Sequence, residues 1–338
     1  MDVLWSRCSG QDCIRVRGLP ACAGLQVRPA TAAALRAVPP TAGRLVADGA
    51  DLCFVPRFGF VDGTTYAVTI DPLTIDEAAG TALLVRERPE RAASTEVLAI
   101  YPSAADVPRN LLRLYVWFSA PMSEGYAAEH VRLTDDAGGP IVGALLPTEN
   151  ELWDPGRRRL TVLLDPARIK RGLASHRQVG YPLRSGAAVR LVVDDQFRDA
   201  HGSRLRAPAE REYRVGDDER RHVEPQAWTL TAPPRHTAAP LEIGFDRSLD
   251  HGLLTRCLRV IGPDGRRVDG TCEIGQGERS WRLIPRLNWV PGTHQLLVDP
   301  ALEDLAGNSV TRVFDRDLTR VADGPRPTQP VAVTFRPP

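Results

Sequence analysis

Lysine is nearly absent from this chain of 338 residues: Lys170 is the only one, and the other 42 of the 43 basic residues are arginine. Two interpretations stay open, a GC-rich genome or selection for guanidinium groups that grip carboxylates and phosphates. A net charge of one sign is also lacking, because 42 acidic residues leave the chain at +1. This balance gives no support to a general binder of nucleic acids.

Long apolar runs are missing as well. No stretch reaches the roughly 18 apolar residues that span a bilayer, so the sequence predicts no membrane span. The start, MDVLWSRCSGQDC, has neither the basic region nor the apolar region of a signal peptide. We therefore expect either a cytoplasmic protein or one whose leader precedes this numbering.

Catalytic signatures are the third absence. The sequence contains no HExxH, GxSxG or Walker-type glycine-rich motif, and no GxGxxG follows a strand-like run. The seven histidines are scattered without the i,i+4 pairing of a metal-binding helix. We predict no catalytic residues, no obligatory cofactor and a protein that is not an enzyme.

What the chain does contain is a repeat. Residues 52–70 (LCFVPRFGFVDGTTYAVTI) align without a gap on residues 281–299 (WRLIPRLNWVPGTHQLLVD) when Pro56 is placed on Pro285. RLTVLLDP (159–166) and SGAAVRLVVD (185–194) form another copy. There the step from proline to glycine spans 20 positions rather than 7, an insertion of 13 residues. Repeats of this kind indicate tandem domains.

The local pattern predicts an all-β chain. Short alternating apolar runs are separated by turns, and 29 prolines and 28 glycines are spread along the sequence. Each repeat holds about seven strand-like runs over about 110 residues, which is typical of a β-sandwich. We predict three domains: an irregular, cysteine-rich one at 1–96, one at 97–218 with a basic insertion at about 167–184, and one at 219–338.

Two short motifs carry a resemblance to a known family. FSAPM (118–122) follows Tyr101-Pro102, and DLAGN (304–308) stands near the end of the last repeat. The chain resembles the bacterial Ig-like domains of S-layer and other surface proteins. The resemblance implies tandem Ig-like β-sandwiches and a non-catalytic structural or adhesion-type interaction module of a cell-envelope or secreted protein, located in the periplasm or on the cell surface.

Two other functions stay open. One is a carbohydrate-binding protein or an accessory subunit of a hydrolase, because Trp153 lies in the polar stretch TENELWDPGRRR, where its ring could stack on a sugar. The other is a cytoplasmic assembly component, which free cysteines would favour.

The six cysteines are candidates for disulfides. Cys257 and Cys272 flank the GPDG turn symmetrically, so a hairpin there would make them cross-strand partners. The other four, all in the first repeat, would form two more bridges: Cys8, Cys13, Cys22 and Cys53. Disulfides favour an oxidising compartment. Free buried thiols and a metal site are the alternatives.

The basic insertion is the candidate contact surface. Residues 157–184 hold eight basic residues and a single acid, Asp165. We expect this segment to project from one end of its sandwich and to contact an acidic glycan or an acidic protein face; a solvated loop neutralised by nearby acids is the alternative. Replacing Arg168, Lys170 and Arg171 with serine should then weaken partner binding without lowering thermal stability. The candidate binding residues are Trp153, Arg157, Arg158, Arg159, Arg168, Lys170, Arg171 and Arg177.

A weak cation site is the last candidate. Asp194, Asp195 and Asp199 follow a strand-like run, and their oxygens could hold Ca²⁺. The alternative is that they cap turns.

Overall fold

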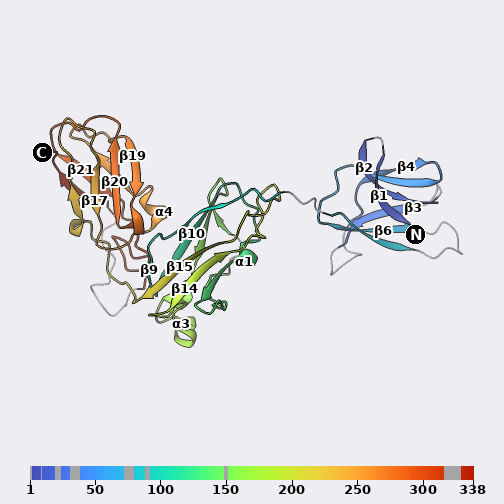
Figure 1. The fold of residues 1–338 in the computed structure, drawn as a ribbon, viewed down its shortest axis with the longest axis horizontal. Helices are drawn as coiled ribbons and strands as arrows, with labels where there is room; N and C mark the ends of the chain where they lie inside the picture. Colours follow the sequence, from blue (N-terminus) through green and yellow to red (C-terminus); the bar gives the residue numbers. More distant parts are fainter. Residues whose placement is uncertain are drawn as a thin grey trace. The chain divides into compact units, whose positions relative to one another are not determined.

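The computed structural model describes residues 2–8, 10–19, 24–30, 39–71, 80–87, 92–147, 151–315 and 329–338. The chain divides into two compact units, Met1–Glu90 and Arg91–Pro338 (Figure 1). Within the described ranges, no helix is both long and apolar enough to cross a membrane.

The described residues of the first unit form a sandwich of seven strands, called here the N-terminal sandwich. One sheet has the order β1-β2-β5-β4 and the other the order β3-β6-β7. If the strands are lettered A to G along the chain, these sheets are ABED and CFG, the arrangement of a constant-type immunoglobulin domain. This sandwich, expected to be irregular, has the regular strand order. The strands are β1 (Val3–Cys8), β2 (Gln11–Val16), β3 (Gly24–Pro29), β4 (Gly43–Asp48), β5 (Asp51–Pro56), β6 (Thr65–Asp71) and β7 (Thr81–Val85).

The second unit begins with the middle sandwich. Its sheets have the orders β12-β13-β10-β8 and β11-β14-β15-β9, which are again ABED and CFG, with β9 added in parallel to β15. The elements are β8 (Val97–Tyr101), β9 (Asp106–Pro108), β10 (Arg113–Phe118), α1 (Ala127–His130), β11 (Val131–Asp135), β12 (Leu152–Trp153), β13 (Arg159–Leu163), α2 (Pro166–Ile169), α3 (Ala174–Val179), β14 (Ala188–Val193) and β15 (Ala209–Gly216).

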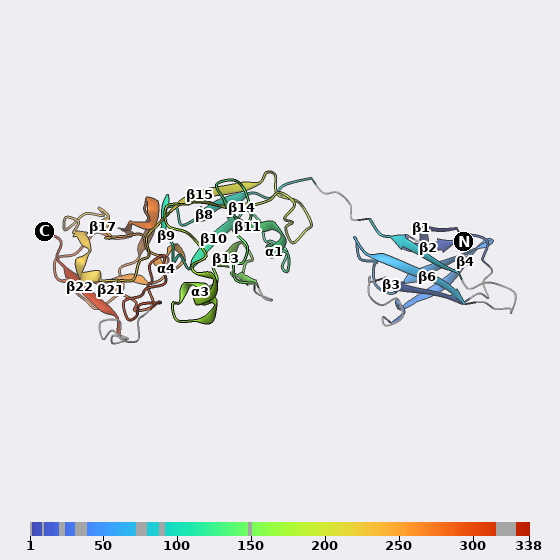
Figure 2. The same cartoon turned by 90° about the horizontal axis from the view of Figure 1, so that it is seen from below.

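The C-terminal sandwich completes the second unit. Its sheets, β16-β17-β20-β19 and β18-β21-β22, repeat the ABED and CFG orders. Both views place β9 and α4 where this sandwich meets the middle one (Figures 1 and 2). The elements are η1 (Pro225–Ala227), β16 (Thr229–Thr231), β17 (Leu241–Gly244), α4 (His251–Leu254), β18 (Leu258–Ile261), β19 (Gly270–Ile274), η2 (Gln276–Glu278), β20 (Ser280–Pro285), β21 (His294–Val298) and β22 (Val331–Phe335).

Each sandwich buries its own apolar core, because alternate residues of every strand point inward. In the N-terminal sandwich Ile14 and Phe54 are buried between the sheets. Leu114 and Leu191 do the same in the middle sandwich, and Trp281 in the C-terminal one. The predicted all-β fold of tandem Ig-like sandwiches is confirmed. The predicted domain boundaries remain predictions, and the helical pattern at 31–38 lies outside the described residues.

The sequence repeat corresponds to one structural segment: strand E, the E–F connection and strand F. Pro56 and Pro285 each end their strand, β5 and β20, and β6 and β21 follow. In the middle sandwich the same connection joins β13 to β14, and the insertion supplies α2 and α3 there. Asp165 begins α2 by accepting the backbone N–H of Ala167.

The disulfide prediction is wrong for the described cysteines. Cys8, Cys13, Cys53, Cys257 and Cys272 are all free thiols, and Cys22 lies outside the described residues. Cys13 and Cys53 are not paired in register, because Cys13 lies opposite Ser6 and Cys53 opposite Arg15. Their thiols pack against each other in one small buried cluster and remain reduced.

The GPDG turn forms locally but does not lead to the expected hairpin. The backbone N–H of Gly262 donates to Arg266 O, and that of Val268 donates to Val260 O. The chain then crosses to the other sheet, where Cys272 lies opposite Leu283 of β20, whereas Cys257 precedes β18 of the CFG sheet. The two cysteines therefore belong to opposite layers of the sandwich.

Candidate functional site

The structure divides the predicted basic surface into two groups. Arg157 and Arg158 lie in the turn before β13, whereas Arg168 to Arg177 lie after that strand has ended. Five residues of extended chain separate the two ends by about 17 Å. The run of positive charge is thus continuous in sequence only.

The first group contacts its own sandwich. Arg158 Nη1 donates to Ser119 O at 2.6 Å, and the Arg159 guanidinium lies 5.6 Å from the centre of the Tyr115 ring. Arg157 adopts a left-handed backbone with φ 52°.

Trp153 is anchored rather than free. Its Nε1 donates to Glu151 Oε2 at 2.6 Å, and its ring packs 5.8 Å from Phe118 and 6.2 Å from Phe197, measured between ring centres. A neighbouring hollow of about 470 Å³ is lined mainly by apolar side chains, among them Val131 and Leu160. Such a lining offers few partners for sugar hydroxyls.

Arg168, in the second group, is buried without a carboxylate. Only 9% of the residue is exposed. Its guanidinium donates to four backbone carbonyls, with Gly143 O at 2.8 Å, Tyr181 O at 2.9 Å, Gly180 O at 3.2 Å and Val142 O at 3.4 Å. This side chain ties the C–D connection to the insertion.

The rest of the insertion docks onto the segment that follows the F–G turn of the C-terminal sandwich. Lys170 Nζ lies 4.5 Å from the centre of the Phe314 ring. Arg171 Nε donates to Asp315 Oδ2 at 2.9 Å, and the carboxylate of Asp315 is 2% exposed. Arg177 remains on the surface, where its Nη2 donates to Gly172 O. The insertion therefore serves an internal junction.

That junction contains a buried charge cluster. Arg113 Nε, on β10, lies 3.3 Å from Asp250 Oδ2. Arg113 Nη2 also donates a hydrogen bond to Glu303 Oε2. Tyr115 donates its hydroxyl to Asp250 Oδ1 at 2.8 Å, and Asp250 caps α4 through the N–H of Leu253. Burial raises the pKa of the Glu303 carboxyl, and the charge of Arg113 opposes that shift. Two sandwiches thus share one set of desolvated charges.

A second polar cluster crosses the same junction. Both carboxylate oxygens of Glu278 accept the backbone N–H of Ser103 at 2.9 Å. Glu278 is fully buried and holds a left-handed backbone with φ 53°, an arrangement that only surrounding packing sustains. The His251 ring stacks on Tyr101, with ring centres 3.4 Å apart.

The two F–G turns are built alike. Asp304 Oδ1 accepts the N–H groups of Ala306 and Asn308 at 2.9 Å, and Asp199 Oδ1 accepts those of His201 and Ser203 at 2.9 Å. Burial raises the pKa of Asp304 to about 7, while the charge of Arg247 acts in the opposite direction.

Each turn also holds the chain that enters its own sandwich. Asn308 Nδ2 donates to Glu219 O at 2.9 Å, and Thr95 Oγ1 donates to Asp199 Oδ2 at 2.8 Å.

The three aspartates of the weak Ca²⁺ candidate do not form one ligand set. Asp194 bonds His130 Nδ1 and Arg132, and Asp195 accepts from Gln196 Nε2. The oxygens of Asp199 are taken by the turn and by Thr95. Throughout the described ranges, no three His, Cys, Asp or Glu side chains gather as a possible metal site.

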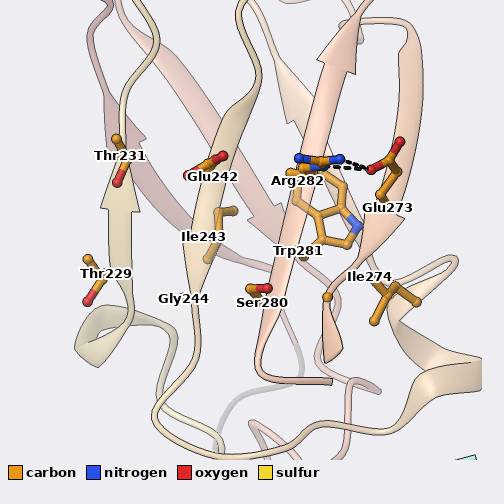
Figure 3. A pocket seen from close by; sticks show the side chains of 11 residues that line it. Thr229, Thr231, Glu242, Ile243, Gly244, Glu273, Ile274, Ser280, Trp281 and Arg282 are labelled. Carbon is orange, nitrogen blue, oxygen red and sulfur yellow. Dashed lines mark hydrogen bonds and ion pairs between the residues drawn. The ribbon is translucent and has the colours of Figure 1, made fainter. Parts of the chain in front are cut away.

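A hollow of about 450 Å³ lies on the outer face of the β16-β17-β20-β19 sheet (Figure 3). Oxygen-bearing side chains surround it, and Gly244 forms part of its floor. No sequence motif marks this hollow, because its residues come from four strands. The junction clusters were missed for the same reason, although the DLAGN motif marks one edge of the junction.

No protein-family model and no curated protein matches the chain. Among solved structures, it is similar to native alpha-2-macroglobulin from Escherichia coli spanning domains MG0-NIE-MG1 (8% identity, 72% of this chain and 71% of that chain, TM-score 0.25). It is also similar to the chicken CNTN1 FN1–FN3 domains (10% identity, 99% and 98%, TM-score 0.23). A third similar structure is the BSP domain of a biofilm associated protein (7% identity, 87% and 62%, TM-score 0.22). Likenesses this distant carry no argument about ligands or partners.

Proposed function

We propose that this chain is a non-catalytic interaction module, of the spacer or adhesion type, of a bacterial cell-envelope or secreted protein. In this proposal the middle and C-terminal sandwiches form one stiff arm. The observation that carries it is the buried junction, where Arg113 meets Asp250 and Glu303. The resemblance of FSAPM and DLAGN to bacterial surface domains supports the cellular setting.

Stiffness follows from the cost of separating buried charges. Interfaces between domains of one chain are usually polar enough to allow relative motion. Here Asp250 and Glu278 are almost completely buried, and each takes a donor from the other sandwich. Opening the junction would remove hydrogen-bond donors from both buried carboxylates at once, which costs free energy. A stiff arm can hold a binding surface at a fixed distance from its point of attachment.

The basic insertion contributes to this arm by contacting the C-terminal sandwich at the junction. Lys170 and Arg171 face the C-terminal sandwich, which leaves Arg158 and Arg177 as the exposed, outward members of the predicted contact set. Binding of an acidic protein or glycan to these two arginines remains part of the proposal.

A cytoplasmic assembly component is the second candidate. The observation that favours it is the free state of the five described cysteines, since thiols persist in reducing compartments. The same stiff arm would then serve as a scaffold inside the cell.

The junction is tested by calorimetry on the full chain. We expect the middle and C-terminal sandwiches to unfold in one transition, with cleavage by trypsin at Arg220 and Arg221 reporting when the junction opens. Arg113→Met leaves Asp250 and Glu303 without their shared cation, so it should cost about 3–5 kcal/mol and split the transition.

Arg190→Met is the matched control, because Arg190 forms an exposed ion pair with Glu212 on a sheet face of the middle sandwich. It should leave the transition intact. Two separate transitions in the unaltered chain would contradict the stiff arm.

A further inference from the structure

We propose that the hollow on the outer face of the C-terminal sandwich, called here the sheet hollow, binds a primary ammonium group carried by another molecule. Its lining includes Thr229, Thr231, Glu242, Gly244, Ser280 and Arg282. The proposal rests on the interaction role above and names the chemistry of one partner.

The hollow arises from two adjacent rows of residues across the sheet. In the first row Glu242 lies opposite Thr231 on one side and Arg282 on the other, and Glu273 follows on β19. In the second row Thr229, Gly244 and Ser280 lie opposite one another. Figure 3 shows the two rows one above the other. Because the second row has only small side chains, the surface is sunken there.

The charges of the first row are unequally paired. Arg282 directs its guanidinium to Glu273, with Nε 2.6 Å from Oε2 and Nη2 on the same oxygen. Glu242 has no ion pair or hydrogen bond within the described part of the chain. The row therefore carries two carboxylates and one cation, and the unpaired carboxylate borders the hollow.

Hydroxyl groups complete the lining. Thr229, Thr231 and Ser280 are exposed, and none of their hydroxyls has a partner in the described residues. Ser280 Oγ fills the space beside Gly275, where a Cβ would stand 2.0 Å away. Serine and threonine oxygens accept hydrogen bonds on either side of Glu242.

This set of oxygens fits an ammonium better than other groups. An ammonium has three donors and no acceptor, so one donor can reach Glu242 while the others reach hydroxyls on β16 and β20. A phosphate or carboxylate would be repelled by Glu242. A guanidinium is planar and presents its donors as a fork, which suits a carboxylate alone rather than acceptors spread around it.

A second copy of this chain is a poor source of a lysine ammonium. Lys170 is the single lysine of this chain, and it is already placed over Phe314. A second copy therefore offers no free lysine. We assign the ammonium to a lysine side chain of a partner protein, in keeping with the proposed interaction role, and the amine of an amino sugar is the other outcome of the test.

The first experiment compares three probes that share a butyl group: n-butylammonium, n-butylguanidinium and n-butanol. Each is titrated into the ¹⁵N-labelled full chain at pH 7, and amide shifts are followed by transverse-relaxation-optimised NMR. We expect n-butylammonium to shift the amides of residues 229–231, 242–244 and 280–282, with an affinity at least tenfold above that of the other two. Equal responses to all three probes, or no response, would overturn the proposal.

Variants then test the lining. Glu242→Gln removes the charge and keeps the shape, so it should weaken n-butylammonium binding at least tenfold. Glu210→Gln, at an exposed carboxylate on β15 of the middle sandwich, is the matched control and should change nothing. Gly244→Val should also abolish binding by filling the hollow, since a Cβ there would meet Thr229 Cβ only at 3.7 Å.

Three further ligands separate the sources. A lysine-containing peptide with blocked ends is compared with a glucosamine oligomer and with its N-acetylated form, which lacks the charge. Tighter binding of the peptide indicates a protein partner, and tighter binding of the free-amine sugar indicates a glycan. Binding of the acetylated sugar as tight as that of the free amine would refute an ammonium site. These outcomes leave the calorimetric test of the stiff arm untouched, so the two proposals can fail separately.

Discussion

At the scale of single residues, Arg168 shows why charge in a sequence is not a map of the surface. It lies in the most basic stretch of the chain, which favours an exposed contact role. In the structure its guanidinium is buried and satisfied by four carbonyls. Arginine can take this position because its five donors fan out in a plane. Nothing in the neighbouring sequence distinguishes it from Arg177, which is exposed.

This difference predicts unequal effects of two substitutions in one insertion. Arg168→Ser leaves several buried carbonyls without donors and removes packed methylenes, so we expect a loss of about 2–4 kcal/mol in the free energy of unfolding. The structure thus reverses the expectation that this change spares stability. Arg177→Ser should stay within about 0.5 kcal/mol. Chemical denaturation of both variants measures the two losses. Equal losses of unfolding free energy would show that the hydrogen bonds of Arg168 do not stabilise the fold.

Asp304 gives a prediction for pH. Burial raises its pKa from 3.8 to about 7, so between these values the folded chain keeps a proton that the unfolded chain releases. The contribution of Asp304 to stability is therefore full below about pH 4 and is lost as the pH rises toward 7, by up to about 1.4 kcal/mol per unit. Asparagine has no such proton, so the unfolding free energy of the wild type should fall relative to Asp304→Asn over this range.

The measurement is urea denaturation of both proteins from pH 4.5 to pH 8. Asp199→Asn is the control, because Asp199 holds the same place in the F–G turn of the middle sandwich. It reports how much stability is lost when an asparagine replaces the aspartate that accepts the turn hydrogen bonds. A stability difference between the wild type and Asp304→Asn that stays constant over this range would contradict the prediction, because it would mean that Arg247 keeps the carboxylate ionised throughout.

At the scale of secondary-structure elements, the sequence predicts what is local. The gapless match of residues 52–70 with 281–299 covers two strands and the short connection between them, so one spacing fixes both turn and register. The same spacing locates the insertion after Pro166. The sequence does not show what the insertion contacts, because Asp315 and Phe314 lie more than 140 residues further along the chain.

The GPDG turn marks the limit of local inference. A turn and two flanking apolar runs are typical of a hairpin, and a short one does form between Val260 and Val268. The strand that follows then pairs with β20 instead. The competing partner is a longer strand whose inward residues, such as Trp281 and Leu283, complete the core. Burial in the sandwich thus decides the pairing, and no turn motif reports it.

At the scale of the whole molecule, repetition made the tandem fold predictable, while the junction and the sheet hollow were not. Arg113, Asp250, Glu278 and Ser103 are dispersed over more than 170 residues. No motif in the sequence around any one of them indicates that it lies at a junction. They become neighbours only when one sandwich packs on the other. Their role can therefore be recognised only in the three-dimensional structure.

The cysteines carry the last prediction, because they bear on where the whole molecule works. Cys13 and Cys53 are completely buried, and burial raises the pKa of Cys13 and of Cys257 to about 11. Cys272 is exposed. At pH 7.5 we expect N-ethylmaleimide to modify Cys272 first in the folded chain, and Cys13, Cys53 and Cys257 only after unfolding, since the thiolate is the reactive form. Mass spectrometry of tryptic peptides makes the assignment.

Protein isolated under alkylating conditions from its natural source should show the same free thiols, which would favour the scaffold inside the cell. A disulfide among these positions would contradict the structure and restore the oxidising compartment.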